Sequence, residues 1–155
     1  MASLNRIKLD AGRINEGKWI TVESDGEPFD IRTRGITPRY RDTLQRLRLE
    51  RVRTINRTRD PGAPMVSVET LPPSLDDLCL GQALAEECFL DVRGLTHDDG
   101  GKVVTVDEFK ALLCDPETGR IFIALVQAAA NEVMADRSGL IETATGNSQP
   151  VSAGS

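Results

Sequence analysis

The sequence predicts a mainly α-helical protein of about four helices, with an N-terminal β-hairpin and a disordered C-terminal tail. Three observations indicate this fold class. Side chains alternate along residues 18–34 around an Asp25-Gly26 turn signal, apolar side chains recur at helical spacing in four later segments, and the final residues are small and polar. A chain of 155 residues is long enough for one domain with a real core.

The domain organisation follows from the same patterns. Residues 1–16 are expected to be flexible, residues 17–142 to form a single domain, and residues 143–155 to form a flexible tail. Within the domain, Asp60-Pro61-Gly62 and the prolines that follow predict a non-helical linker over residues 60–73.

The predicted hairpin pairs residues 18–24 with residues 28–34, because Asp-Gly is a strong signal for a two-residue turn. An isolated hairpin is only marginally stable in water, so we expect it to dock on the helices or on another protein. Trp19 is the large apolar side chain available for this. It is either an anchor against the helices or an exposed anchor for a partner.

Residues 38–58 are predicted to form a very basic amphipathic helix, which Thr37 caps and Pro38 begins. The charge of the chain is strongly divided around it, although the net charge is only −5. Residues 32–59 hold ten arginines and two acids, a net charge of +8, whereas residues 69–117 hold twelve acids and three cations, a net charge of −9. Such a division indicates either charged partners or attraction between the two parts of the chain.

The helical part, residues 74–137, is predicted to contain three helices. The first spans residues 74–93, starts at the capping sequence Ser74 to Asp77 and occupies the centre of the fold. The second starts at a capping box, Thr105 to Glu108, and the third spans about 116–136. The stripe from Phe122 to Val133 on the third helix is either core or a contact surface. The three cysteines are expected to be reduced core residues: Cys79, Cys88 and Cys114.

No catalytic motif is visible, and we predict that the protein is not an enzyme and has no cofactor or metal site. His97 is the only histidine and is expected to be a loop residue without a role. A calcium loop over residues 96–107 would have a glycine at a ligand position and too few carboxylates. No apolar stretch approaches the ~18 residues of a membrane span, and the N-terminus does not resemble a secretory signal, so a cytoplasmic location is expected.

The arginine-rich helix is the feature that most favours a binding function. Arginine makes bidentate contacts with phosphates and carboxylates, so this helix is a surface for a protein partner, is balanced by the acidic part of the chain, or binds nucleic acid. The predicted partner-binding residues are Trp19, Arg41, Arg48, Arg51 and Arg59.

Taken in order, the motifs of the chain resemble the tail assembly chaperones of long-tailed bacteriophages and prophages of proteobacteria. The resemblance covers residues 17–147. It is carried by these segments: Gly17-Lys-Trp-Ile20, Ile31-Arg-Thr-Arg34, the helix around Tyr40, Ala83 to Leu90 with Gly94-Leu95, Asp98-Asp-Gly100, Val103-Val-Thr105, Leu112-Leu113, Ala128-Ala-Ala130 and Gly146-Asn147.

The resemblance implies a mainly helical, non-enzymatic assembly factor in the host bacterial cytoplasm. Proteins of this family coat the tape measure protein, recruit tail tube subunits and leave before the virion is finished, and many have a longer frameshifted form. Two other functions stay open: a structural protein of the virion tail or neck, and a nucleic-acid-binding protein that uses the arginine-rich helix. Self-association is also left open.

Overall fold

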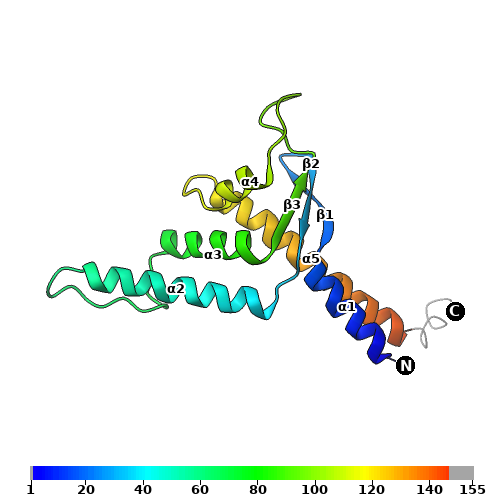
Figure 1. The fold of residues 1–155 in the computed structure, drawn as a ribbon, viewed down its shortest axis with the longest axis horizontal. Coiled ribbons are helices and arrows are strands. Elements are labelled where there is room, and N and C mark those ends of the chain that lie inside the picture. The colour runs from blue at the N-terminus through cyan, green and yellow to red at the C-terminus, as the bar shows by residue number, and fades with distance from the viewer. Residues whose placement is uncertain (1, 147–155) are drawn as a thin grey trace.

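The computed structural model of the protein describes residues 2–146 and, within them, the side chains of residues 2–135 apart from residue 10. The described part of the chain contains five helices and one small sheet, and Figure 1 shows how they are arranged. In chain order the elements are α1 (Leu4–Glu16), β1 (Lys18–Ser24), β2 (Glu27–Thr33), α2 (Pro38–Thr58), α3 (Pro73–Glu87), β3 (Phe89–Arg93), α4 (Val106–Leu113) and α5 (Gly119–Gly146).

The sheet is antiparallel, with strand order β1-β2-β3. The predicted hairpin is confirmed, and its two-residue turn has positive φ angles at Asp25 (52°) and Gly26 (79°), as a type I′ turn requires. Its buried side chains, among them Ile20 and Ile31, lie on one face, which α5 crosses. The hairpin therefore docks on a helix of its own chain.

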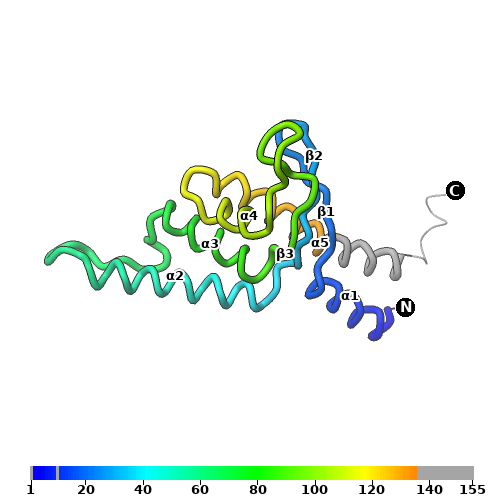
Figure 2. Tube along the Cα trace, turned by 45° about the horizontal axis from the view of Figure 1, so that its top comes forward, coloured from blue at the N-terminus to red at the C-terminus, as the bar shows by residue number. Residues whose placement is uncertain are grey.

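The helices form the other layer, with α3 at its centre. Helix α3 contacts α2, α4, α5 and β3, and Figure 2 shows α2 running along α3 away from the sheet. The core between these elements contains an aromatic cluster in which Phe109 stacks on Phe89 and meets Phe122 edge to face. Val126 and Ala129 are fully buried, so the stripe on the last helix is mainly core.

The predicted fold class is right in being mainly helical, in its hairpin and in the central position of α3, but about four helices were predicted where the structure has five, and the third strand was not predicted. The helix predicted over residues 74–93 ends at Glu87, and residues 89–93 form β3 instead. Cys88, Phe89 and Leu90 are apolar in either structure, so their periodicity does not distinguish a helix from a strand. Pairing with β2 determines that these residues form a strand, because a third strand stabilises the hairpin.

Residues 1–16 were predicted to be flexible, whereas residues 4–16 form helix α1. Residues distant in sequence hold its C-terminal end. The Arg34 side chain donates to the Asn15 carbonyl at 2.6 Å, and the Gly35 N–H donates to the Ile14 carbonyl at 3.1 Å. A cation at a helix C-terminus is stabilising, but here it is supplied from beyond the hairpin, where sequence periodicity does not reveal it.

Of the four predicted helix starts, two are confirmed and two are wrong, one of them that of the last helix, which begins at Gly119 rather than at about residue 116. Thr37 accepts the Tyr40 N–H ahead of Pro38, and Thr105 forms a full capping box with Glu108. Helix α3, however, begins one residue before Ser74, with Pro72 at the N-cap position and no side-chain cap.

The last helix is longer than predicted, because α5 spans Gly119–Gly146 rather than about 116–136. The predicted tail, residues 143–155, therefore includes four helical residues, and its remainder from residue 147 lies outside the described residues. Within the part of the chain that the structure describes, no helix combines the length and the apolar character of a membrane span.

We predict that Gly81→Ala destabilises the protein by about 1–3 kcal/mol, because overpacking costs this much. Gly81 lies where α3 meets the end of α4, and a Cβ there would overlap the Leu113 carbonyl oxygen. Gly12→Ala in α1 is the matched control. A Cβ at Gly12 meets no atom within 4 Å, so this change should be neutral or stabilising. Urea unfolding of both variants measures the difference, and equal stability would contradict the packing described.

Candidate partner-binding surfaces

The basic helix α2 is held to the acidic helix α3 by a two-point ion pair. The Arg48 guanidinium donates to both carboxylate oxygens of Asp76, at 2.6 and 3.2 Å. Both side chains are partly buried, 26% and 30% exposed, so solvent screens this pair less than an exposed one. Arg48 was predicted to bind a partner, but in the structure it forms an ion pair within the chain.

Two more arginines of α2 pair with the opposite end of α3. Arg39 lies 3.4 Å from Glu87, and Arg46 lies 3.5 Å from Glu86 and 3.0 Å from Glu50 of its own helix. These pairs are more exposed and each contributes little to stability. Together with Arg48 they show that the charge division in the sequence is partly used for attraction within the chain.

The other three predicted arginines lie in different environments. Arg51 is partly buried against the Cys79 thiol, where it opposes the increase in the pKa of Cys79 that burial causes. Arg59 donates to the Ala63 carbonyl at 2.7 Å and so braces the linker. Arg41 is exposed, and no ion-pair partner for it occurs among the described residues.

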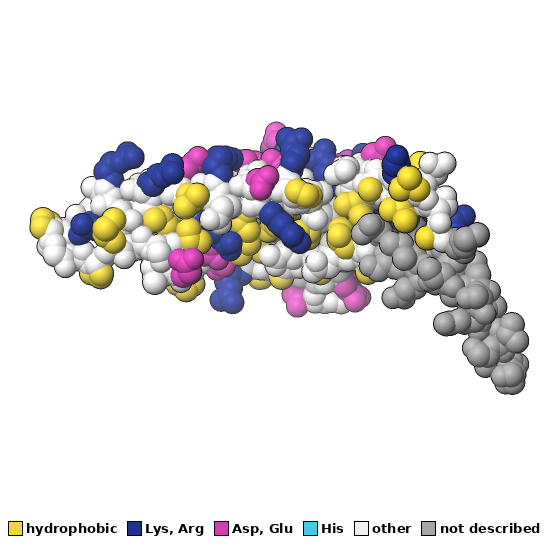
Figure 3. Space-filling model, turned by 90° about the horizontal axis from the view of Figure 1, so that it is seen from below, with side chains coloured by type: hydrophobic (Ala, Val, Ile, Leu, Met, Phe, Trp, Pro, Cys, Tyr) yellow, Lys and Arg dark blue, Asp and Glu magenta, His cyan; other side chains and the backbone are white. Residues whose placement is uncertain are grey.

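Two exposed arginines that the prediction omitted, Arg53 and Arg57, also lack an ion-pair partner in the described part of the chain. They are four residues apart and therefore share a face of α2. Sequence spacing does not single them out, because each has an acid three residues away: Glu50 for Arg53 and Asp60 for Arg57. On the face of the molecule that Figure 3 shows, Lys and Arg side chains are interspersed with hydrophobic and acidic side chains rather than gathered in one patch.

Trp19 lies on the face of the sheet opposite to the buried Ile20 and is itself half-buried. The Arg93 guanidinium covers its ring at 4.1 Å and also binds Asp30 at 2.8 Å. Hydrogen bonds from Arg93 and from Thr21 hold the pKa of Asp30 below its usual value. This face of the sheet is therefore a polar network built around one aromatic ring.

A predominantly apolar groove of about 450 Å³ lies between the N-terminal ends of α3 and α5. Leu78, Leu113 and Ile123 line it, and Asp77 and Arg120 contribute charge to its lining. The loop from α4 to α5 forms one side, because Asp115 accepts the N–H groups of Glu117 and Thr118 and so fixes the turn before α5. Sequence analysis did not predict this groove, since its lining comes from three separate segments.

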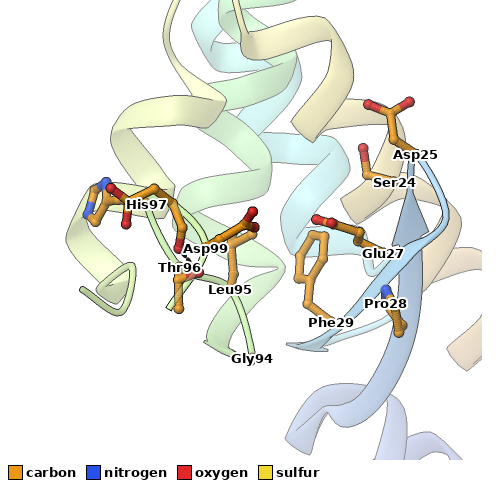
Figure 4. Close-up of a pocket in the computed structure, with 11 residues that line it drawn as sticks. Ser24, Asp25, Glu27, Pro28, Phe29, Gly94, Leu95, Thr96, His97 and Asp99 are labelled. Atoms are coloured by element: carbon orange, nitrogen blue, oxygen red, sulfur yellow. Dashed lines mark hydrogen bonds between the residues drawn. The ribbon is translucent and has the colours of Figure 1, made fainter. Parts of the chain in front are cut away.

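A second cleft, of about 520 Å³, lies between the hairpin turn and the loop after β3. Its lining includes Asp25, Glu27 and Asp99 around Phe29. Figure 4 shows the His97 imidazole on the far side of its loop from Phe29.

The His97 imidazole lies against a carboxylate oxygen of Glu108 in the capping box. A hydrogen bond from Thr105, followed in importance by the nearby His97, lowers the pKa of Glu108. The histidine thus helps to fix the loop to the start of α4. Among the described residues no group of three or more His, Cys, Asp or Glu side chains could hold a metal ion.

The chain was compared with known proteins in three ways. No family model matches it, and no match was found among curated proteins or among solved structures. The assignment of a function therefore depends on the residues and surfaces described above.

The cysteines differ in exposure, and the prediction that all three are core residues is wrong for Cys114, which is exposed at the end of α4. Cys79 and Cys88 are buried as predicted. Burial raises the pKa of the Cys88 thiol to about 12, so it is protonated at neutral pH.

We predict that one thiol of the native protein, that of Cys114, reacts with a thiol reagent, because reaction requires an accessible thiolate. The other two thiols should react only after unfolding in denaturant. Spectrophotometric thiol counting tests this, with Cys114→Ser as the control that should lose the native reaction. Reaction of Cys79 or Cys88 in the folded protein would contradict the burial described.

Proposed function

We propose that the protein is a non-enzymatic phage tail assembly chaperone that binds the tape measure protein and recruits tail tube subunits in the host bacterial cytoplasm. Two lines of support differ in kind. The order of motifs along residues 17–147 resembles that family, and the molecule has surfaces suited to holding polypeptides.

The observation that carries the proposal is the apolar groove between α3 and α5. A long amphipathic helix presents apolar side chains every three or four residues, and a groove between two helix ends can take one such side chain. The charges of Asp77 and Arg120 in the lining would orient the partner helix. An apolar floor with a charged lining allows contacts that are specific and still reversible, as a chaperone that later leaves requires.

Nucleic-acid binding is the second candidate, and the exposed Arg41, Arg53 and Arg57 favour it. Engagement of Arg48 with Asp76 weighs against it, because a phosphate would have to compete with a two-point ion pair within the chain. Binding that weakens steeply with salt would distinguish this candidate from polypeptide binding in an apolar groove. A stoichiometric amount of the chain in purified virions would instead favour the third candidate, a structural tail or neck protein.

Co-expression with candidate tape measure and tail tube proteins, followed by affinity purification, tests the proposal. We predict that Ser74→Trp weakens capture of the tape measure protein by about tenfold or more, because the indole would fill the groove that Ser74 lines. Ser74 is exposed in the first turn of α3, so the core should be unaffected.

Asn131→Trp is the matched control, since Asn131 is exposed on α5 and does not line the groove. It should bind as the unsubstituted protein does. Circular dichroism of both variants checks that they fold. Two results would contradict the proposal. One is that Ser74→Trp captures the tape measure protein as well as the unsubstituted protein does. The other is that the unsubstituted protein captures none of the candidate tail proteins.

A further inference from the structure

The two edges of the sheet differ in how they are protected. At the β3 edge, the strand is short, the ladder is irregular between Arg32 and Thr33, and the Val92 N–H is taken by the Asp91 carboxylate at 2.8 Å. Irregular pairing and side chains that occupy backbone groups are ways in which proteins block an edge. The β3 edge is therefore a poor site for a further strand.

The β1 edge has none of these protections. The strand is seven residues long, continuous in register with β2 and free of proline. In Figures 1 and 2 no other element runs along its outer side. Within the described residues, no backbone hydrogen bond joins Trp19, Thr21 or Glu23 to a group beyond the hairpin. A regular, unpaired edge of this length is a template for another strand.

The turn determines which backbone groups face outward. A two-residue type I′ turn is closed by a hydrogen-bonded pair, here Ser24 and Glu27. Bonding then alternates along an antiparallel ladder, so residues 20, 22 and 24 direct their N–H and C=O groups to β2. Trp19, Thr21 and Glu23 direct theirs to the open edge.

This set of outward groups is self-complementary. If a second β1 runs antiparallel with Thr21 opposite Thr21, then Trp19 lies opposite Glu23, and all three outward residues of each strand pair. On the other face Ile20 lies opposite Val22, a favourable apolar contact. The register is therefore one that uses every outward group of β1 while it keeps apolar side chains on the core face.

Charge also favours a second copy of this chain. Glu23 is exposed and has no ion-pair partner among the described residues. In this register it would lie beside Trp19 of the other copy, whose ring carries the Arg93 guanidinium. Two-fold symmetry makes this contact occur twice, as in other isologous interfaces. A strand from an unrelated protein would not supply it.

From these observations we propose that the chain forms a two-fold dimer by antiparallel pairing of β1 with β1 across Thr21, which joins the two sheets into one of six strands. The inference does not depend on the chaperone function. If the chain does not form this dimer, the result of the Ser74→Trp capture experiment would be unaffected.

Analytical ultracentrifugation over a concentration series tests the proposal. The protein should sediment as a dimer, and Thr21→Pro should weaken dimerisation by about tenfold or more, because it removes central hydrogen bonds worth roughly 1 kcal/mol each. Thr21→Val keeps the N–H and is the matched control. A chain that stays monomeric, or a dimer that Thr21→Pro does not weaken, would overturn the proposal.

A disulfide test gives a second answer in case Thr21→Pro does not fold. In a Cys114→Ser background, Thr21→Cys should form a covalent dimer on mild oxidation, because paired residues in such a ladder have Cα atoms about 5.5 Å apart. Glu23→Cys in the same background should not, since residue 23 faces residue 19 and lies several residues from its own copy. Cross-linking of Glu23→Cys alone, or of neither variant, would refute this register.

Discussion

The attachment of α2 to α3 is the constraint on which the shape of the molecule depends. Helix α2 holds seven arginines and two acids in 21 residues, and α3, its main contact, holds four acids and no cation. Apolar burial is the larger energy, since each of Tyr40, Leu44 and Leu47 contributes roughly 1.5–3 kcal/mol. The ion pairs contribute less but determine register, because Arg48 and Asp76 meet only in one alignment of the two helices.

The sheet shows how a marginal element becomes stable. The β1–β2 hairpin buries one face against α5, and β3 adds a third strand directly after α3. Helix α3 is thereby joined to the sheet at its C-terminal end and to α2 along its length. The hairpin, the basic helix and the core are thus linked through one element, which explains why α3 is apolar on more than one face.

The sequence patterns predicted the local elements well and the long-range contacts poorly. The bounds of α2 agree with the structure, and those of the hairpin agree to within one residue, because Thr37-Pro38 and Asp25-Gly26 carry local backbone chemistry. Helix α1 and strand β3 were missed because Arg34 and strand β2, which stabilise them, are distant in sequence. Arg48 was expected at a partner surface, and its pairing with Asp76 depends on a contact across 28 residues that no local pattern contains.

A double-mutant cycle on Arg48 and Asp76 tests most directly whether the divided charge of the sequence holds α2 to α3. Arg48→Gln, Asp76→Asn and the double variant are compared by urea unfolding, with Arg46→Gln and Glu86→Gln as an exposed reference pair. The account predicts a coupling of about 1 kcal/mol for the first pair and less than about 0.5 kcal/mol for the second. Strictly additive effects of Arg48→Gln and Asp76→Asn would contradict it.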